Sequence, residues 1–174
     1  MEQKDLEIAL LTEPHTICNK LHSFPRGTTL VYDRSIPRDK AAPRAAIVAS
    51  RSLGITALEQ WCRRDCAAAC VKLDGRQTII ASVYLDIKQS ARPDWLDGLL
   101  NMAARKSYPI ILCVDTNAHS SLYGPSNNAR GNDIEDLVLH HGLEVANRGE
   151  APTFETRRGD KLIQTHIDLS LIHI

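Results

Sequence analysis

The chain has 174 residues with 43% hydrophobic and 24% charged side chains, an ordinary composition for a single globular domain over residues 1–174. Its 21 Lys and Arg residues balance its 21 Asp and Glu residues, which argues against a protein that holds nucleic acid by charge alone. No apolar run is long enough to span a bilayer and no signal-peptide pattern begins the chain, so we expect an intracellular protein with no membrane partner.

The first predicted strand covers residues 6–11 and is followed by Glu13-Pro14. Pro14 cannot continue a central strand and should hold Glu13 in extended geometry. Glu13 is either a solvated loop charge or a carboxylate delivered by a buried strand. Further strands are predicted at residues 28–32 and 45–50. The basic loop between them, which includes Arg44, suits solvent or phosphate, and residues 56–64 suggest a short helical turn.

The next two predicted strands, residues 67–73 and 78–85, form a hairpin because Asp74-Gly75 between apolar runs is a strong turn signal. Ser82 and Tyr84 lie two positions apart on the second strand and therefore share a face. The Tyr84 hydroxyl is either satisfied in the core or aimed into a site, and the sequence favours the core.

The five cysteines show no paired C-x-x-C spacing, which argues against a disulfide framework or a zinc ribbon. Cys62, Cys66 and Cys70 recur at steps of four and could share a helical face. Cysteine in an Ala-rich segment usually acts as a small hydrophobe, so we expect a structural role for them.

A helix is predicted over residues 93–106, with acids in its first turn and bases in its last, which complements the helix dipole. The apolar run 110–114 then reads as a strand buried on both faces, and it ends in Asp115. If the strand extends to Asn117, the two side chains point the same way and could handle a water and a phosphate oxygen. The alternative is an ordinary turn, in which Asp and Asn bond their own backbone.

Residues 126–131 are expected to form a loop, residues 132–140 a helix that stops at Gly142, and residues 143–146 a short strand. Another strand begins near residue 152, and the basic segment 157–161 reads as the tip of a hairpin. Residues 163–174 are predicted to form one final strand that contains Asp168. A buried Asp is costly unless it is paired, so this acid is unusual there.

Three acids, Glu13, Asp115 and Asp168, are therefore carried by predicted strands. Oxygen-rich groups of this kind suit Mg²⁺ or Mn²⁺, held by few protein ligands and several waters as in phosphate chemistry. The sequence has no phosphate-binding Gly-rich loop, no H-E-x-x-H and no G-x-S-x-G motif.

Seven short motifs in order resemble the endonuclease domain of non-LTR (LINE-type) retrotransposons. They are L-L-T-E-P, P-R-A-A-I, S-V-Y-L, D-T-N-A-H-S-S-L-Y-G, N-N-A-R-G, A-N-R-G-E-A-P-T-F and H-I-D-L-S-L. That domain belongs to the exonuclease–endonuclease–phosphatase superfamily, with the apurinic endonucleases and deoxyribonuclease I. The resemblance implies an α/β (α+β) fold in which two β-sheets form a sandwich flanked by helices, in four layers.

The resemblance also implies residue roles. Glu13 would bind the metal, Asp115 would orient or deprotonate the attacking water, Asn117 would hold the scissile phosphate, Tyr84 would lie near the phosphate and leaving group, and Asp168 would orient a histidine. His119 belongs to the D-x-N-A-H loop, and with Arg157, Arg158 and Lys161 it is a candidate for substrate binding. The implied reaction is in-line attack of water on a DNA phosphodiester with Mg²⁺, in a protein fused to a reverse transcriptase and acting on genomic DNA in the nucleus.

Two parts of the family pattern are missing from this sequence. They are an early strand with an asparagine before Glu13 and a C-terminal S-D-H motif after Asp168. We therefore expect a domain truncated at both ends. Two alternatives follow: a catalytically dead fragment that retains a DNA- or protein-binding surface, or a phosphodiesterase or phosphatase of the same superfamily that acts on a small molecule such as a phosphoinositide.

Overall fold

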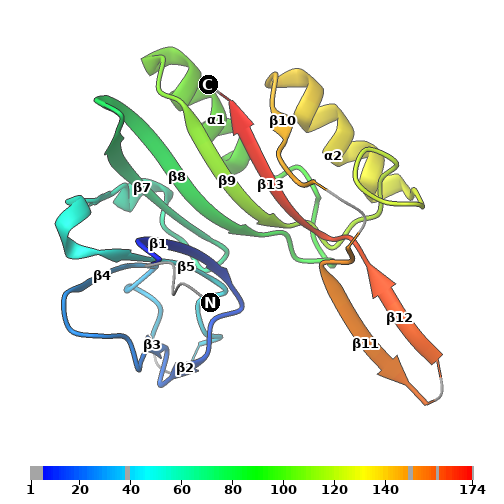
Figure 1. Ribbon diagram of the computed structural model, residues 1–174, viewed down its shortest axis with the longest axis horizontal. Helices are drawn as coiled ribbons and strands as arrows, with labels where there is room; N and C mark the ends of the chain where they lie inside the picture. Colours follow the sequence, from blue (N-terminus) through cyan, green and yellow to red (C-terminus); the bar gives the residue numbers. More distant parts are fainter. Residues whose placement is uncertain (1–5, 38–39, 149–150, 160, 174) are drawn as a thin grey trace. The chain divides into compact units, whose positions relative to one another are not determined.

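A computed structural model describes residues 6–37, 40–148, 151–159 and 161–173. The contacts divide the chain into two compact units, residues 1–84 and 85–174 (Figure 1). None of the helices in the described ranges is long and apolar enough to cross a membrane.

The first unit contains a three-stranded antiparallel sheet in the order β1-β5-β4. Its strands are β1 (Ile8–Thr12), β4 (Thr28–Val31) and β5 (Ala45–Ser50), close to the predicted ranges. A ribbon of β2 (Thr16–Ile17) and β3 (Lys20–Leu21) follows β1, and η1 (Arg51–Leu53) is a 3₁₀ turn after β5.

The second layer of this unit is the long hairpin of β7 (Cys66–Leu73) and β8 (Arg76–Tyr84), with the short β6 (Thr56–Ala57) paired to β7. Asp74 and Gly75 turn the chain with φ of 47° and 81°, the left-handed pair that a tight two-residue hairpin turn requires, so the predicted turn is confirmed.

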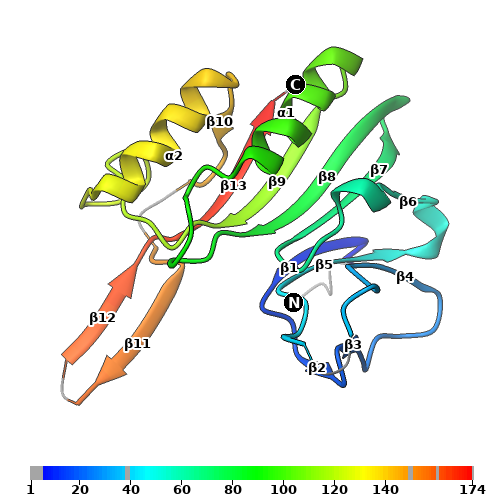
Figure 2. The ribbon, with the colours of Figure 1, turned by 180° about the vertical axis from the view of Figure 1, so that it is seen from behind.

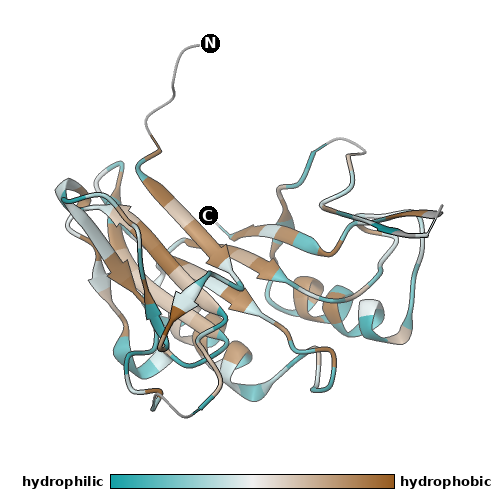
Figure 3. Cartoon of the chain, turned by 90° about the horizontal axis from the view of Figure 1, so that it is seen from below, coloured by the Kyte–Doolittle hydropathy of each residue, from teal (hydrophilic) through white to brown (hydrophobic). Residues whose placement is uncertain are grey.

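The hairpin packs face to face on the three-stranded sheet, since β5 contacts β7 and β8 and β1 contacts β8. Ser82 on β8 donates to Leu11 O on β1 at 2.6 Å, so the face of the hairpin that carries Ser82 and its register partner Ala67 is turned to this sheet, and both residues are fully buried. Figure 3 shows the long strands as mainly hydrophobic and the connecting loops as mainly hydrophilic. The predicted sandwich is confirmed.

Two expectations for the first unit need correction. The predicted short helical turn over residues 56–64 is present only as the 3₁₀ turn η2 (Glu59–Trp61), which follows the strand β6. Cys66 and Cys70 lie on β7, so the spacing of four reflects alternation along a strand and not a helical face. Cys66 is fully buried, as a small hydrophobe would be, and burial raises its thiol pKa to about 12.

The second unit has a three-stranded antiparallel arrangement with β13 (Asp168–His173) between β9 (Ile110–Asp115) and β10 (Glu144–Val145). The helices α1 (Asp94–Lys106) and α2 (Ala129–His140) cover one face of these strands (Figure 2). Leu96, Leu99, Ile134 and Leu137 supply the buried side of the two helices. A separate hairpin of β11 (Phe154–Arg158) and β12 (Lys161–Thr165) projects from this unit (Figure 1).

A polar contact ties the start of α1 to the end of α2. Asp97 accepts three hydrogen bonds from the Arg92 guanidinium and one contact from His141 Nε2 at 2.6 Å. The Arg92 bonds, aided by His141, lower the pKa of Asp97 to about 2 although partial burial opposes the shift.

Two element boundaries in the second unit differ from expectation. Helix α2 begins at Ala129, three residues earlier than predicted, because Asn128 caps it by accepting from Gly131 N at 2.7 Å. The predicted final strand is two strands, β12 and β13. They pair with different partners and are separated at His166-Ile167.

Candidate functional site

Glu13 lies directly after β1, in the first unit. Its backbone N–H donates to Arg44 O at 2.8 Å, so pairing with the β5 side continues one residue beyond the strand. Its φ is 47°, in the left-handed region, and the prediction that Pro14 would keep it extended was wrong. A non-glycine residue held in this region is strained by about 1 kcal/mol or more, and such positions cluster at functional sites. The side chain is exposed.

Arg44 joins Glu13 to Tyr84. The Arg44 guanidinium donates to both carboxylate oxygens of Asp65, at 2.6 and 2.7 Å, and it lies 4.2 Å from the centre of the Tyr84 ring. Asp65 O also accepts from Tyr84 N at 2.9 Å. Since Arg44 and Asp65 are only 14% and 16% exposed, the pair holds a rigid position. Tyr84 is half-buried, with a cation over its ring.

Asp115 and Asp168 lie opposite each other in the second unit. They are the last residue of β9 and the first of β13, and they are Cα partners in the antiparallel register. Directly opposite residues have Cβ atoms about 4.5–5.5 Å apart, so two acids share one end of the strand pair. Asp115 is buried, at 9% exposed. This juxtaposition is unfavourable for stability unless a proton or a cation relieves it.

Asp168 is held by residues from two neighbouring loops. Its backbone N–H donates to Thr153 Oγ1 at 3.1 Å, and its carbonyl accepts from Asn147 Nδ2 at 3.0 Å. Asn147 Oδ1 accepts from Ser170 N at 2.7 Å, so this amide bridges two residues of β13. Burial raises the pKa of Asp168, and a bond from Thr153 opposes the shift.

The D-T-N segment turns sharply after β9. Asn117 has a φ of 48°, so the strand does not extend to it and the condition for a shared face with Asp115 is not met. Asn117 N donates to Asp115 Oδ1 at 3.3 Å, which is the Asx turn that was the alternative reading. Asn117 Nδ2 reaches Leu85 O at 3.3 Å. Thr116, fully buried, is anchored by two bonds to Ile167 O, both 2.8 Å.

His119 is fixed through its backbone by the start of α2. Its carbonyl accepts from Asn128 N at 3.0 Å. A Cβ at Gly131 would lie 1.8 Å from His119 O, so only glycine allows this approach. The N-N-A-R-G segment therefore places the helix start directly against the D-T-N-A-H loop.

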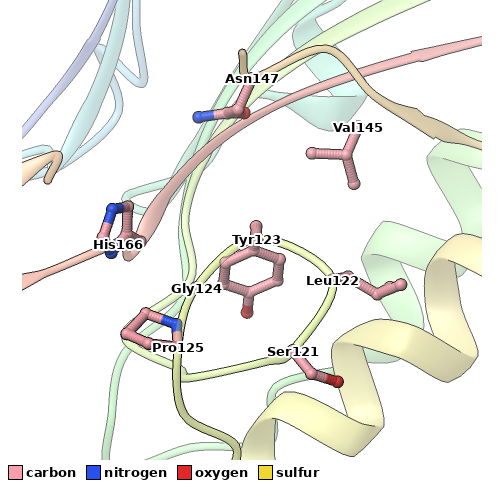
Figure 4. A pocket seen from close by; sticks show the side chains of 8 residues that line it. All are labelled: Ser121, Leu122, Tyr123, Gly124, Pro125, Val145, Asn147 and His166. Carbon is pink, nitrogen blue, oxygen red and sulfur yellow. The ribbon is translucent and has the colours of Figure 1, made fainter. Parts of the chain in front are cut away.

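A cavity of about 630 Å³ opens beside these loops. Figure 4 shows the Tyr123 ring across it, with Leu122 and Val145 on one side and His166 and Asn147 on the others. The described residues that line it include no Asp, Glu, Lys or Arg, so these walls suit an uncharged group with a flat apolar face.

The basic tip lies on the β11–β12 hairpin, with Arg157 opposite Leu162 and Arg158 opposite Lys161 in the register. Arg157 is exposed. The side chains of Arg158 and Lys161 lie outside the described part of the structure, as does residue 160.

Few of the described carboxylates are placed to bind a metal ion. In the described ranges, no three His, Cys, Asp or Glu side chains gather closely enough to hold an ion. Glu13 is exposed, and no described side chain hydrogen-bonds its carboxylate. Mg²⁺ usually keeps several waters and binds through one or two carboxylates plus substrate phosphates, so an ion on Glu13 is compatible with these residues.

The structure thus brings together Glu13 and Tyr84 through Arg44 in the first unit, and Asp115, Asn117 and Asp168 in the second. Sequence reasoning missed Arg44 as part of a partly buried ion pair, because it belongs to a loop of mixed basic residues. It also missed Arg130, whose guanidinium donates to three backbone carbonyls. The quoted N-N-A-R-G motif was the one signal that pointed to it.

Comparison with protein families gives a match to the endonuclease–reverse transcriptase model over residues 78–173, more than half of the chain. Comparison with curated protein sequences gives no significant match.

Solved structures share the fold. The endonuclease domain of TRAS1, a telomere-specific non-LTR retrotransposon, is 23% identical with a TM-score of 0.75, over 95% of this chain and 72% of that one. An endonuclease/exonuclease/phosphatase family protein from Leptotrichia buccalis is 12% identical with a TM-score of 0.64, over 98% and 76%. The human Nocturnin catalytic domain is 17% identical with a TM-score of 0.55, over 95% and 68%. At these identities the likeness shows the fold alone.

Proposed function

Because the chain belongs to the endonuclease–reverse transcriptase family, we propose that it is a metal-dependent phosphodiesterase that nicks DNA. The observation that carries the proposal is the placement of Asp115 opposite Asp168 with Asn117 held in a left-handed turn beside them. Acids and an amide on rigid strand ends are the groups needed to orient a water and hold a phosphate.

In this proposal Asp115 orients the attacking water and accepts its proton, and the Asn117 amide donates to a non-bridging phosphate oxygen. Burial raises the pKa of Asp168, which favours its neutral form and so would reduce repulsion between the two acids. Tyr84, fixed under the Arg44 guanidinium, is assigned to the leaving-group side.

Mg²⁺ or Mn²⁺ bound at Glu13 would neutralise charge that develops on the phosphate. Glu13 suits this role because its backbone is fixed by Arg44 while its carboxylate stays exposed.

The proposed substrate is DNA, which is in keeping with the endonuclease–reverse transcriptase family and with the telomere-specific retrotransposon endonuclease domain of the same fold. Arg157, Arg158 and Lys161 on the projecting hairpin would contact its backbone, and His119 would lie near the substrate. We further propose that the domain is fused to a reverse transcriptase in its parent protein and acts on genomic DNA in the nucleus.

The test is nicking of supercoiled plasmid by the 174-residue chain with Mg²⁺, with EDTA, and as Asp115→Ala. Asp136→Ala is the matched control, because Asp136 is an exposed acid on α2. We expect metal-dependent nicking that Asp136→Ala retains and Asp115→Ala loses. Asn117→Ala should lower the rate about 10²-fold or more, the usual cost of one donor to a developing anion.

Equal nicking by wild type and Asp115→Ala would refute the assignment of the site. DNA binding without nicking, indifferent to Mg²⁺ and to Glu13→Gln, would favour the alternative of a binding-only protein. Cleavage of phosphoinositide in a parallel assay, without cleavage of plasmid, would change the substrate class.

A further inference from the structure

The Arg130 side chain contacts the D-T-N segment, and among the described residues its hydrogen bonds go to backbone carbonyls. Its Nε donates to Thr116 O at 2.9 Å, Nη1 to Gln89 O at 2.7 Å and Nη2 to Leu85 O at 2.9 Å. In the described part of the chain it makes no ion pair with a carboxylate. Burial lowers its pKa, and nearby Asp133 opposes this shift most strongly.

Burying part of an arginine without a carboxylate partner costs desolvation free energy. Its planar fork nevertheless spans three carbonyls that no single shorter side chain could reach together. Those carbonyls belong to the segment after β8 and to the turn after β9, which carries Asn117. The guanidinium therefore fixes the backbone on both sides of the candidate catalytic turn.

Two donors converge on one of these acceptors. Leu85 O receives Arg130 Nη2 at 2.9 Å and Asn117 Nδ2 at 3.3 Å. The shorter bond, from a charged donor, is the stronger of the two. Leu85 N also donates to Asp115 O at 2.8 Å, so this residue is a backbone partner of the acid as well.

This sharing has a chemical consequence for Asn117. The Asn117 N–H that donates to Leu85 O can serve a substrate phosphate only after it releases this acceptor, and a carbonyl left without a donor would oppose the release. Here Leu85 O keeps the Arg130 bond when Asn117 leaves. The Asn117 amide is held in place while the site is empty. It can then donate to a new acceptor without leaving Leu85 O unsatisfied.

We propose that Arg130 is a positioning residue that keeps Leu85 O satisfied, so that the Asn117 amide can exchange its resting bond for a substrate phosphate oxygen. The part that concerns phosphate rests on the proposed function, whereas the shared carbonyl does not. Asn128 and Gly131 serve the same arrangement, because they set the first turn of α2 and so the position from which Arg130 reaches the loop.

The first test measures the Asn117 side-chain amide in the free protein by ¹⁵N NMR, with the signal assigned through Asn117→Ala. Arg130→Met should leave Asn117 as the sole side-chain donor to Leu85 O, so its amide protons should shift and exchange more slowly with solvent. The control is Arg105→Met, an exposed arginine at the end of α1. An Asn117 signal that is identical in wild type and Arg130→Met would overturn the proposal. If Arg130→Met does not fold, the same comparison is made with Arg130→Lys, which keeps a charge but loses the fork.

The second test is a double-mutant cycle on nicking with Arg130→Met, Asn117→Ala and both together. Loss of one donor to a buried carbonyl corresponds to roughly a 5- to 150-fold fall in kcat/KM for Arg130→Met. If Arg130 acts through Asn117, adding Arg130→Met to Asn117→Ala should lower the rate by less than about 2-fold. Multiplicative losses would mean that Arg130 only supports the fold, and the proposal would fail.

The two tests separate two kinds of failure. If the protein does not nick plasmid but shows the change in the Asn117 signal, the shared carbonyl is supported and the proposed phosphodiesterase function is refuted. If the protein nicks plasmid, shows no change in the Asn117 signal and gives multiplicative losses, the proposed function is supported and the role of Arg130 is refuted.

Discussion

Replacement of Gly131 by alanine tests the close contact between α2 and the His119 backbone. The added Cβ would lie 1.8 Å from His119 O and 2.7 Å from Asn127 Oδ1. A contact to a backbone oxygen below 3.0 Å cannot be tolerated, so the first turn of α2 or the loop must move by more than an ångström. Either movement strains the Asn128 bonds to His119 O and to Gly131 N.

The magnitude follows from opposing effects. Overpacking at a tight site costs about 1–3 kcal/mol, and a weakened N-cap costs about 1 kcal/mol. Alanine is the better helix former by about 1 kcal/mol, which offsets part of the loss. We expect a fall of about 2 kcal/mol in the free energy of unfolding, which for a chain of this size lowers Tm by about 4–8 °C.

Circular dichroism melts and urea unfolding of wild type, Gly131→Ala and Leu139→Ala would measure the effect. Leu139 lies on the same helix and is 76% exposed, so its variant should change stability by less than about 0.5 kcal/mol. The direction of the change in Tm for Gly131→Ala decides the outcome. Helix propensity alone predicts that Gly131→Ala stabilises the protein, so a Tm equal to or above that of wild type would refute the contact.

Three further perturbations have defined outcomes. Arg92 is the main reason that the pKa of Asp97 is lowered to about 2, so the stabilisation from Asp97 should be present above pH 4 and be lost as the pH falls from about 4 to 2. Urea unfolding of Asp97→Asn should therefore give a free energy of unfolding that depends less on pH in this range than that of wild type. An equal pH dependence in the two proteins would contradict the ion pair. Asp168, whose pKa is raised by burial, disfavours the folded state once ionised, so Asp168→Asn should raise the Tm at pH 7 relative to wild type while it lowers nicking, and a fall in Tm would count against the burial effect. Tyr84→Phe should keep the contact with Arg44 and the Tm within about 2 °C, whereas Tyr84→Leu should lower the Tm further; equal melts for the two variants would exclude the cation–π contact.

Local patterns determined most of the secondary structure. The hairpin of β7 and β8 was predictable because Asp-Gly is one of few pairs that adopt two left-handed conformations in succession. Helix α1 was predictable because its apolar spacing, first-turn acids and last-turn bases agree with one another. Strand β9, with Asp115 at its end, followed from an apolar run of the right length.

Errors arose where a distant segment decided a local conformation. Glu13 is left-handed while its N–H pairs with Arg44 O, a partner that the residues around Pro14 do not reveal. The break between β12 and β13 is equally invisible locally, because a continuous apolar alternation does not say that its two halves pair with different strands.

The sequence by itself determined which acids and amides stand at strand ends, and the order of motifs determined the family. Only the tertiary structure decided which of these groups meet. Asp115 and Asp168 are 53 positions apart in the chain, and the antiparallel register of β9 and β13 makes them direct neighbours. Arg130 acquires its place because three carbonyls from separate segments converge on one guanidinium. Hydrogen bonds between distant segments depend on strand register and helix position, and both are set by burial of the whole core, which no short stretch of sequence specifies.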